Sequence, residues 1–321
     1  MKFDYIIGNP PYQMEDGGAG ASATPVYNKF IDAVKELDPS VLSLIIPAKW
    51  YSGGKGLDQF RQEMLNDSHI RRLADYTNSL DVFPDADIAG GVCIFVRDKS
   101  YEGGGCHYSN THNGITTKCQ RKLDMFDTFI RYPLAESIIE KTTALKEITL
   151  TDFVSTRKPF GLRTYVKPST EGELLLRYNK GVGPFRKEDV TAGFDMIDKW
   201  KIIISYLSAE HAGQPDKNGQ FRILSTTEKL PPKSICTETY LVAGAFDTEA
   251  EADNYMAYLK TKFVRFLLAQ VVVTQHISKA SFVFVPAQDF TKQWTDEELF
   301  KKYKLTSEEI AFINNMIKEM N

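Results

Sequence analysis

The sequence lacks the features that assign a chain to several common classes of protein. Its four cysteines, at positions 93, 106, 119 and 236, form no Cys-x-x-Cys pair, which excludes the spacing of a zinc ribbon or a disulfide scaffold. It holds no apolar run of about 18 residues, so we expect no membrane-spanning helix. No charged segment followed by an apolar core opens the chain, and we expect no signal peptide. We therefore predict a cytoplasmic protein with reduced thiols.

An excess of basic charge is also absent. The formal net charge is -3, so any surface that binds nucleic acid must be a local patch. Cys106, His107, His112 and Cys119 are close in sequence, but their spacing matches no standard zinc finger. Glycines around this segment favour a hairpin, and we predict no metal site. With 321 residues and 42% hydrophobic content, the chain is long enough to form two domains.

The most informative stretch that is present is Asn9-Pro10-Pro11-Tyr12, which directly follows a strand-like apolar run at residues 3–8. The two prolines prevent both strand pairing and helix formation, so we expect a stiff loop at the carboxyl end of a strand. In open α/β sheets, ligands bind just beyond these strand ends. A stiff loop there presents an amide, a free carbonyl and an aromatic ring in a fixed geometry.

That combination suits methylation of an exocyclic amino group. The N6 nitrogen of adenine is a poor nucleophile because its lone pair is delocalised into the ring. The side-chain oxygen of Asn9 and the carbonyl oxygen of Pro10 are candidate acceptors for the amino hydrogens. Tyr12 is a candidate to stack on a base that has been flipped out of the duplex. A proline-rich turn that merely closes a strand is the structural alternative.

The stretch resembles the signature of adenine-N6 DNA methyltransferases of restriction–modification systems, in which Asn-Pro-Pro-Tyr follows a strand. The resemblance implies catalytic roles for Asn9, Pro10, Pro11 and Tyr12. It also implies methyl transfer from S-adenosylmethionine to a flipped adenine. In the resembled family the next segments line the cofactor and base pocket. Phe30 and Trp50 are therefore candidate cofactor contacts, although a core aromatic in a helix or loop explains each of them better.

Helix and strand patterns alternate through the first half of the chain. Helical spacing occurs at residues 26–34 and 57–65, and strands are predicted at 41–46, which is a continuous apolar run, and at 70–77 and 91–96. This alternation predicts a parallel sheet connected by crossovers. Residues 15–22 are small and polar, and they predict either a mobile flap over the substrate or a disordered loop.

The part of the resembled family that binds S-adenosylmethionine has no counterpart in this sequence. Family members place a glycine-rich turn and an acidic residue before Asn-Pro-Pro-Tyr, whereas eight residues precede Asn9. Gly181-Val182-Gly183 is a weak downstream candidate that a hairpin turn explains better. We therefore expect the chain alone neither to bind the cofactor nor to methylate DNA. We also expect a missing amino-terminal half, a rearranged loop or self-association to cover the open sheet edge.

The second half carries a basic stretch with interleaved aromatic residues. In residues 153–187 the basic side chains are opposed only by Glu171 and Glu173, which predicts contacts to DNA phosphates and bases. An ordinary solvated face is the alternative. The candidate DNA-binding residues are Arg157, Lys158, Arg163, Arg186 and Lys187, followed further along by Gln275, His276 and Lys279.

Local patterns predict the remaining elements of this half. Residues 122–145 are expected to be helical with an interruption at Pro133. Strands are predicted at 201–206, 234–242 and 282–286, and a helix capped by Asp247 is predicted to run to residue 267. Thr295 with Glu298 and Thr306 with Glu309 have the spacing of capping boxes.

These patterns together predict an α/β fold with two parts. Residues 1–125 are expected to form a partial Rossmann-like methyltransferase sheet, and residues 126–321 an α+β domain that recognises double-stranded DNA. The implied function is site-specific adenine-N6 methylation. The alternative is a DNA-binding target-recognition fragment without catalysis of its own. No convincing nuclease arrangement of Pro-Asp and Glu-x-Lys is present.

Overall fold

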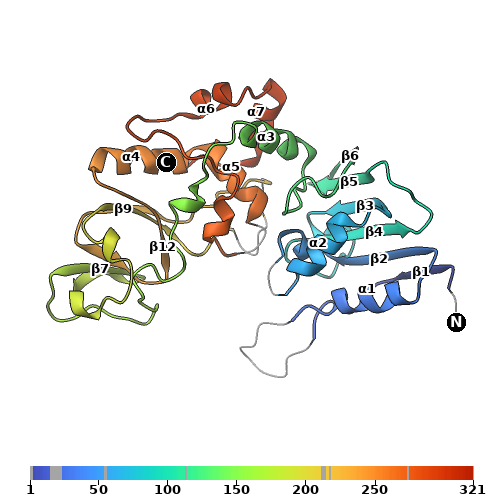
Figure 1. The fold of residues 1–321 in the computed structure, drawn as a ribbon, viewed down its shortest axis with the longest axis horizontal. Coiled ribbons are helices and arrows are strands. Elements are labelled where there is room, and N and C mark those ends of the chain that lie inside the picture. The colour runs from blue at the N-terminus through green and yellow to red at the C-terminus, as the bar shows by residue number, and fades with distance from the viewer. Residues whose placement is uncertain are drawn as a thin grey trace. The chain divides into compact units, whose positions relative to one another are not determined.

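The structure of the chain is a computed structural model that describes residues 3–14, 24–53, 56–112, 114–210, 215–216, 218–272 and 275–320. The chain divides into two compact units, Met1–Pro133 (unit 1) and Leu134–Asn321 (unit 2) (Figure 1). The boundary predicted after residue 125 therefore falls inside unit 1. The predicted flap at residues 15–22 lies outside the described residues.

Unit 1 is built on a six-stranded mixed sheet with the order β1-β2-β4-β3-β5-β6. β1 pairs with β2, and β3 with β5, in parallel, whereas β4 is antiparallel to both β2 and β3. The elements are β1 (Tyr5–Gly8), α1 (Tyr27–Glu36), β2 (Val41–Pro47), α2 (Asp58–Asn66), β3 (Ile70–Tyr76), β4 (Val92–Asp98), β5 (Cys106–His112) and β6 (Ile115–Arg121).

The prediction of a purely parallel sheet was wrong at β4. The segment between β3 and β4 contains a single short 3₁₀ helix, Ser79–Asp81. It has no helix long enough to carry the chain back along the sheet, so β4 returns antiparallel to β3. The hairpin predicted around Cys106 and Cys119 is confirmed as β5 and β6, which pair Tyr108 with Cys119.

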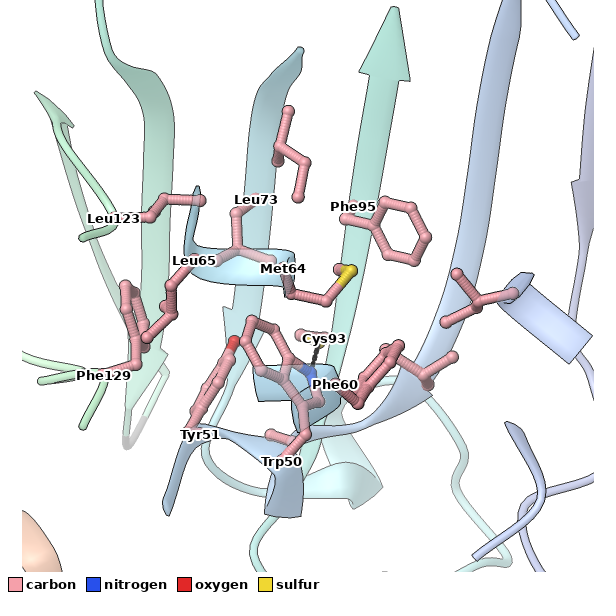
Figure 2. Packing of buried hydrophobic residues seen from close by; sticks show 14 of the residues in the cluster. Trp50, Tyr51, Phe60, Met64, Leu65, Leu73, Cys93, Phe95, Leu123 and Phe129 are labelled. Carbon is pink, nitrogen blue, oxygen red and sulfur yellow. Dashed lines mark hydrogen bonds between the residues drawn. The ribbon is translucent and has the colours of Figure 1, made fainter. Parts of the chain in front are cut away.

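The core of unit 1 lies between one face of this sheet and the helices α1 and α2. Alternate residues of β2, namely Leu42, Leu44 and Ile46, are buried in the same cluster as Ile31 of α1 and Met64 of α2. Figure 2 shows Met64 among Phe60, Leu65, Leu73 and Phe95 in this cluster. The period-2 burial of β2 is the pattern of a strand with one face toward the core.

β1 is an edge strand of this sheet and exposes large apolar side chains. Tyr5 is 71% exposed and Ile7 79% exposed, whereas Ile6, which points the other way, packs against the core. β1 has a single strand neighbour, β2, among the described residues. Its outer side therefore presents unpaired backbone groups beside exposed apolar surface, a combination that favours pairing with another strand.

Unit 2 combines two three-stranded sheets with helices, with strand orders β10-β9-β12 and β11-β7-β8. Both sheets contribute to one cluster that includes Leu176, Ile203 and Val242. The elements are α3 (Pro133–Thr143), β7 (Leu174–Tyr178), β8 (Gly181–Phe185), β9 (Trp200–Ser205), β10 (Thr227–Leu230), β11 (Ser234–Cys236), β12 (Tyr240–Phe246), α4 (Glu249–Lys260), α5 (Lys262–Val271), α6 (Asp296–Lys302) and α7 (Ser307–Met316).

Several predicted boundaries in the second half were wrong, each for a local reason. Residues 122–132 are not helical, because Pro133 is the first residue of α3, a position that suits proline. The strand predicted at 234–242 is two strands, β11 and β12. They are separated by a turn in which the Tyr240 amide donates to the Thr237 carbonyl at 3.0 Å.

The helix predicted from Asp247 is also two helices. Thr248, and not Asp247, caps α4, and the Thr261 side chain then caps α5. The segment at 282–286 forms no strand; a 3₁₀ helix at Lys279–Phe282 precedes an isolated bridge from Pro286 to Thr149. The two capping boxes, at Thr295 and Thr306, are confirmed.

Candidate functional site

The Asn9-Pro10-Pro11-Tyr12 loop lies directly at the carboxyl end of β1, as predicted. Asn9 and Pro11 are exposed, and Pro10 and Tyr12 are partly buried. The chain leaving the loop is fastened to the residues in front of α1. The Val26 amide donates to the Tyr12 carbonyl at 3.2 Å, and the Met14 amide donates to the Thr24 carbonyl at 3.2 Å. The loop is thus held at one end by the sheet and at the other by the start of α1.

The hydroxyl of Tyr12 points into the protein. It is buried and has no hydrogen-bond partner among the described residues. Burial, with a smaller effect from the thiol of Cys93, raises the pKa of Tyr12 to about 12. Tyr12 therefore stays neutral at physiological pH, and its hydroxyl end is fixed against the interior while the residue as a whole keeps partial exposure.

Further polar atoms without partners are buried in the segments next to this loop. They are the hydroxyls of Tyr27 and Tyr51 and the side-chain oxygen of Asn28, again counted over the described part of the chain. Burial raises the pKa of Tyr27 and Tyr51, and the Cys93 thiol acts on both of them as it does on Tyr12. Buried polar atoms without partners are rare in proteins.

Of the two predicted cofactor contacts, one is exposed and one is not. Phe30 on α1 is 44% exposed. Trp50 is fully buried, and its indole Nε1 donates to Cys93 Sγ at 3.4 Å (Figure 2). Its ring lies 4.6 Å from the Tyr51 ring and 5.9 Å from the Phe60 ring, measured between centroids. The structure therefore gives Trp50 the role of a core aromatic.

The described residues do not fit a complete site for S-adenosylmethionine. Gly181 and Gly183 lie in β8, where they pair with Tyr178 and Leu176 of β7. This confirms the predicted hairpin and removes the downstream candidate for a cofactor turn.

A buried charged network that the sequence did not reveal lies at the carboxyl end of β3. Asp75 is 1% exposed, and the Arg131 guanidinium donates to both of its oxygens, at 2.6 and 2.9 Å. The Tyr108 hydroxyl and the Asn110 amide also donate to Asp75, at 3.1 and 2.6 Å. Arg131 in addition donates to the Gly90 carbonyl at 2.8 Å. The network ties β3 and β5 to the turn before β4.

One signal for this network was visible in the sequence. Asp75 lies between Leu73-Ala74 and Tyr76 near the end of a predicted strand, and a buried carboxylate needs a charged or hydrogen-bonding partner. Arg131, 56 positions further along the chain, had no comparable signal.

In unit 2 the structure brings three predicted DNA-binding residues together. Arg157 Nε lies 3.4 Å from Glu238 Oε2, and Arg163 Nη1 lies 3.7 Å from the same atom. The Arg157 guanidinium also lies 4.5 Å from the centroid of the Tyr206 ring. That ring is 4.8 Å from the ring of His276. We call Arg157, Arg163, Tyr206, Glu238 and His276 the Arg157 cluster.

The other predicted residues lie in different surroundings. Arg186 has an ion pair with Glu188 at 3.7 Å, and both side chains are largely exposed. Lys187 opens a 3₁₀ helix with the acidic Glu188 and Asp189. Lys158 has a left-handed backbone with φ 63°. Lys279 is exposed, and the carbonyl of Gln275 accepts from the Ser208 amide at 2.8 Å.

The basic surface was predicted from residues 153–187 alone, and this count missed the acidic residues that pair with the basic side chains. Arg157 and Arg163 approach Glu238, and Arg177 donates to Glu228 at 2.9 Å. Both glutamates are distant in sequence, so a count over residues 153–187 does not find them. The surface around the basic stretch is therefore less positive than its local composition suggests.

The part of the chain that carries the loop is similar in sequence to known methylases. Residues 1–83 match the Eco57I restriction-modification methylase family. A curated relative is an uncharacterized adenine-specific methylase from Mycoplasma pneumoniae, 36% identical over 106 residues, which are 32% of this chain and 25% of the relative. The match thus spans about a quarter of the length of that relative.

Solved structures of restriction-modification proteins also match in part. A methyltransferase subunit of a type I system from Streptococcus thermophilus is 16% identical, with 34% of this chain and 26% of that chain covered and a TM-score of 0.27. The type IIG restriction endonuclease BpuSI is 11% identical, with 93% and 50% covered and a TM-score of 0.35. The type IIL enzyme MmeI in complex with DNA is 8% identical, with 99% and 55% covered and a TM-score of 0.46.

Over the described ranges, no group of three or more His, Cys, Asp or Glu side chains is placed to hold a metal ion. Within the same ranges no helix has both the length and the apolar character needed to cross a membrane.

Proposed function

We propose that this chain is the base-handling and DNA-recognition part of a site-specific adenine-N6 DNA methyltransferase of a restriction–modification system. The observation that carries the proposal is the exposed Asn9 on a stiff loop at the end of β1, with Tyr12 anchored behind it. The match of residues 1–83 to a restriction-modification methylase family supports it, as does the curated relative described as an adenine-specific methylase.

The proposed chemistry needs little more than this loop. The Asn9 side-chain oxygen and the Pro10 carbonyl accept hydrogen bonds from the N6 amino group of the flipped adenine. These bonds return electron density to the nitrogen as it attacks the methyl group, so they are strongest in the transition state. Pro11 keeps the loop rigid, and Tyr12 stacks on the base. A strong general base is not required, because the amino group loses its proton after the transfer.

The proposal also divides the work between the two units. Unit 1 corresponds to the loop-bearing half of a Rossmann-like methyltransferase sheet, and unit 2 to a target-recognition domain for double-stranded DNA. S-adenosylmethionine is the expected methyl donor. The open edge of β1, with Tyr5 and Ile7 exposed, is the place where a cofactor-binding half or a second copy of the chain would pair.

A test uses the chain and the longest reading frame that contains it, each expressed in a bacterial host without adenine methyltransferases. Single-molecule sequencing then maps N6-methyladenine in the host DNA. The longer frame should methylate one short motif, and Asn9→Ala should lower the methylation rate at least about a hundredfold. Asn66→Ala, at the exposed end of α2, is the matched control and should leave the rate unchanged. A loss of less than about tenfold for Asn9→Ala would contradict the role of the loop.

A second candidate function is DNA binding without catalysis. It is favoured by the Arg157 cluster, which lies in a unit separate from the loop. In this case the longer frame would produce no N6-methyladenine, while the purified chain would still shift a DNA duplex in a gel. The same expressed proteins therefore distinguish the two functions.

A further inference from the structure

Arg157 and Arg163 differ from the other predicted DNA-binding residues in what holds them. Their side chains are 51% and 52% exposed, while that of Glu238 is only 6% exposed. Neither guanidinium donates a hydrogen bond to any of the described residues, and Glu238 Oε2 accepts none from them. The carboxylate thus holds both guanidinium groups by charge and leaves their N–H donors available for another acceptor.

The backbone around these side chains is strongly constrained. The Ser155 amide donates to the Val242 carbonyl at 2.8 Å, and the Glu238 amide donates to the Leu162 carbonyl at 2.9 Å. The segment that carries both arginines is therefore hydrogen-bonded to β12 and to the turn before it. At Gly161, where φ is 79°, an added Cβ would lie 1.8 Å from Thr191 Oγ1. Glycine is therefore required at this position of the segment.

The aromatic side of the cluster is held in the same way. The Tyr206 amide donates to the Thr239 carbonyl at 3.0 Å, and the Ile277 amide donates to the Tyr206 carbonyl at 2.9 Å. The backbone of Tyr206 is therefore fixed, and its ring contacts both Arg157 and His276. An arginine that stacks on a fixed ring keeps its planar fork in one orientation.

We propose that Arg157 is a base-reading residue, that it makes a bidentate contact to a guanine in the major groove, and that Glu238 positions it. Arginine is the usual partner of the O6 and N7 atoms of guanine, and this contact requires a fork held in a defined orientation. A contact to a phosphate tolerates a mobile side chain and carries no sequence information. Arg163, beside the same carboxylate, is the neighbouring reader, and the 81% exposed Tyr165 supplies apolar contact next to it.

Arg186 provides the contrast on the same unit. Its ion pair with Glu188 joins two side chains that are 49% and 74% exposed, and neither is fixed by burial. Such a residue suits a phosphate contact and not base readout. This inference rests on the proposed function, because it takes double-stranded DNA as the ligand of unit 2.

The experiment selects duplexes with a randomised central segment on the full chain and compares the enriched sequences between variants. The wild type should enrich a motif that contains guanine. Arg157→Lys keeps the charge but removes the fork, so it should lower the preference for one guanine position by about tenfold to a hundredfold. The salt dependence of binding should remain the same, because the number of positive charges is unchanged. Glu238→Gln should relax the same position without changing the salt dependence.

Arg186→Lys is the matched control and should leave the motif intact. Arg186→Ala should lower the slope of affinity against salt by roughly one unit with no change in the motif. If Arg157→Lys enriches the same motif as strongly as the wild type, Arg157 does not read a base and the proposed function stands. If the wild type binds every sequence equally, unit 2 does not recognise a target sequence, and both this inference and the proposed role of unit 2 are wrong. If the wild type binds no DNA at low salt, the proposed role of unit 2 is wrong as well.

Discussion

Replacing Asp75 by alanine should destabilise unit 1 far more than an exposed change of the same kind. Asp75 accepts hydrogen bonds from Arg131, Tyr108 and Asn110 in a place that water does not reach. The substitution leaves a largely buried guanidinium without its counter-ion, a change that costs about 3–5 kcal/mol. This is a large part of the roughly 5–15 kcal/mol that stabilises a typical domain.

The assay follows the unfolding of unit 1 through the fluorescence of Trp50, one of the three tryptophans of the chain. Changing Trp200 and Trp294 to phenylalanine removes the signal of unit 2. Urea titrations of this background, with and without Asp75→Ala, give the difference in the free energy of unfolding. In protein that keeps Trp200 and Trp294, the transition of unit 2 should not move.

Arg71→Ala is the control, because it breaks an ion pair with Asp98 in which the arginine side chain is 45% exposed. An exposed pair of this kind contributes about 0–1 kcal/mol. The reasoning would be refuted if Asp75→Ala and Arg71→Ala lowered the stability of unit 1 by the same small amount. It would also be refuted if Asp75→Ala shifted the two units equally.

Two other predictions follow from buried groups. Tyr12→Phe should bind a duplex with 2-aminopurine at the target adenine as well as the wild type does, because the lost hydroxyl has no partner among the described residues. Tyr12→Ala should weaken the stacking of the base by about 1–3 kcal/mol. Equal fluorescence of the flipped 2-aminopurine in all three proteins would contradict the stacking role of Tyr12. Burial lowers the pKa of Lys201 from 10.5 to about 8, so between these pH values the unfolded chain binds more protons and the free energy of unfolding should rise with pH. Urea titrations between these pH values should show that the free energy of unfolding rises in the wild type and not in Lys201→Met. The same rise in both proteins would mean that other groups cause it.

The sequence was most informative where a local rule decides the structure. Two prolines after an apolar strand leave no choice but a stiff loop, so Asn9 and Tyr12 were located correctly at the end of β1. The capping boxes at Thr295 and Thr306 were predictable for the same reason, since both partners of each box lie within one helical turn. The β7–β8 hairpin at Gly181 likewise depends on neighbouring residues alone.

Only the tertiary structure decided which distant residues meet. β4 lies between β2 and β3 in the sheet, and Trp50 is a core residue because the rings of Tyr51 and Phe60 pack against it. Asp75 is hydrogen-bonded to Arg131, which lies 56 positions further along the chain. Glu238 forms ion pairs with Arg157 and Arg163, which are far from it in sequence. Such pairings result from the packing of whole units, and no local pattern of residues encodes which partner a buried charge will find.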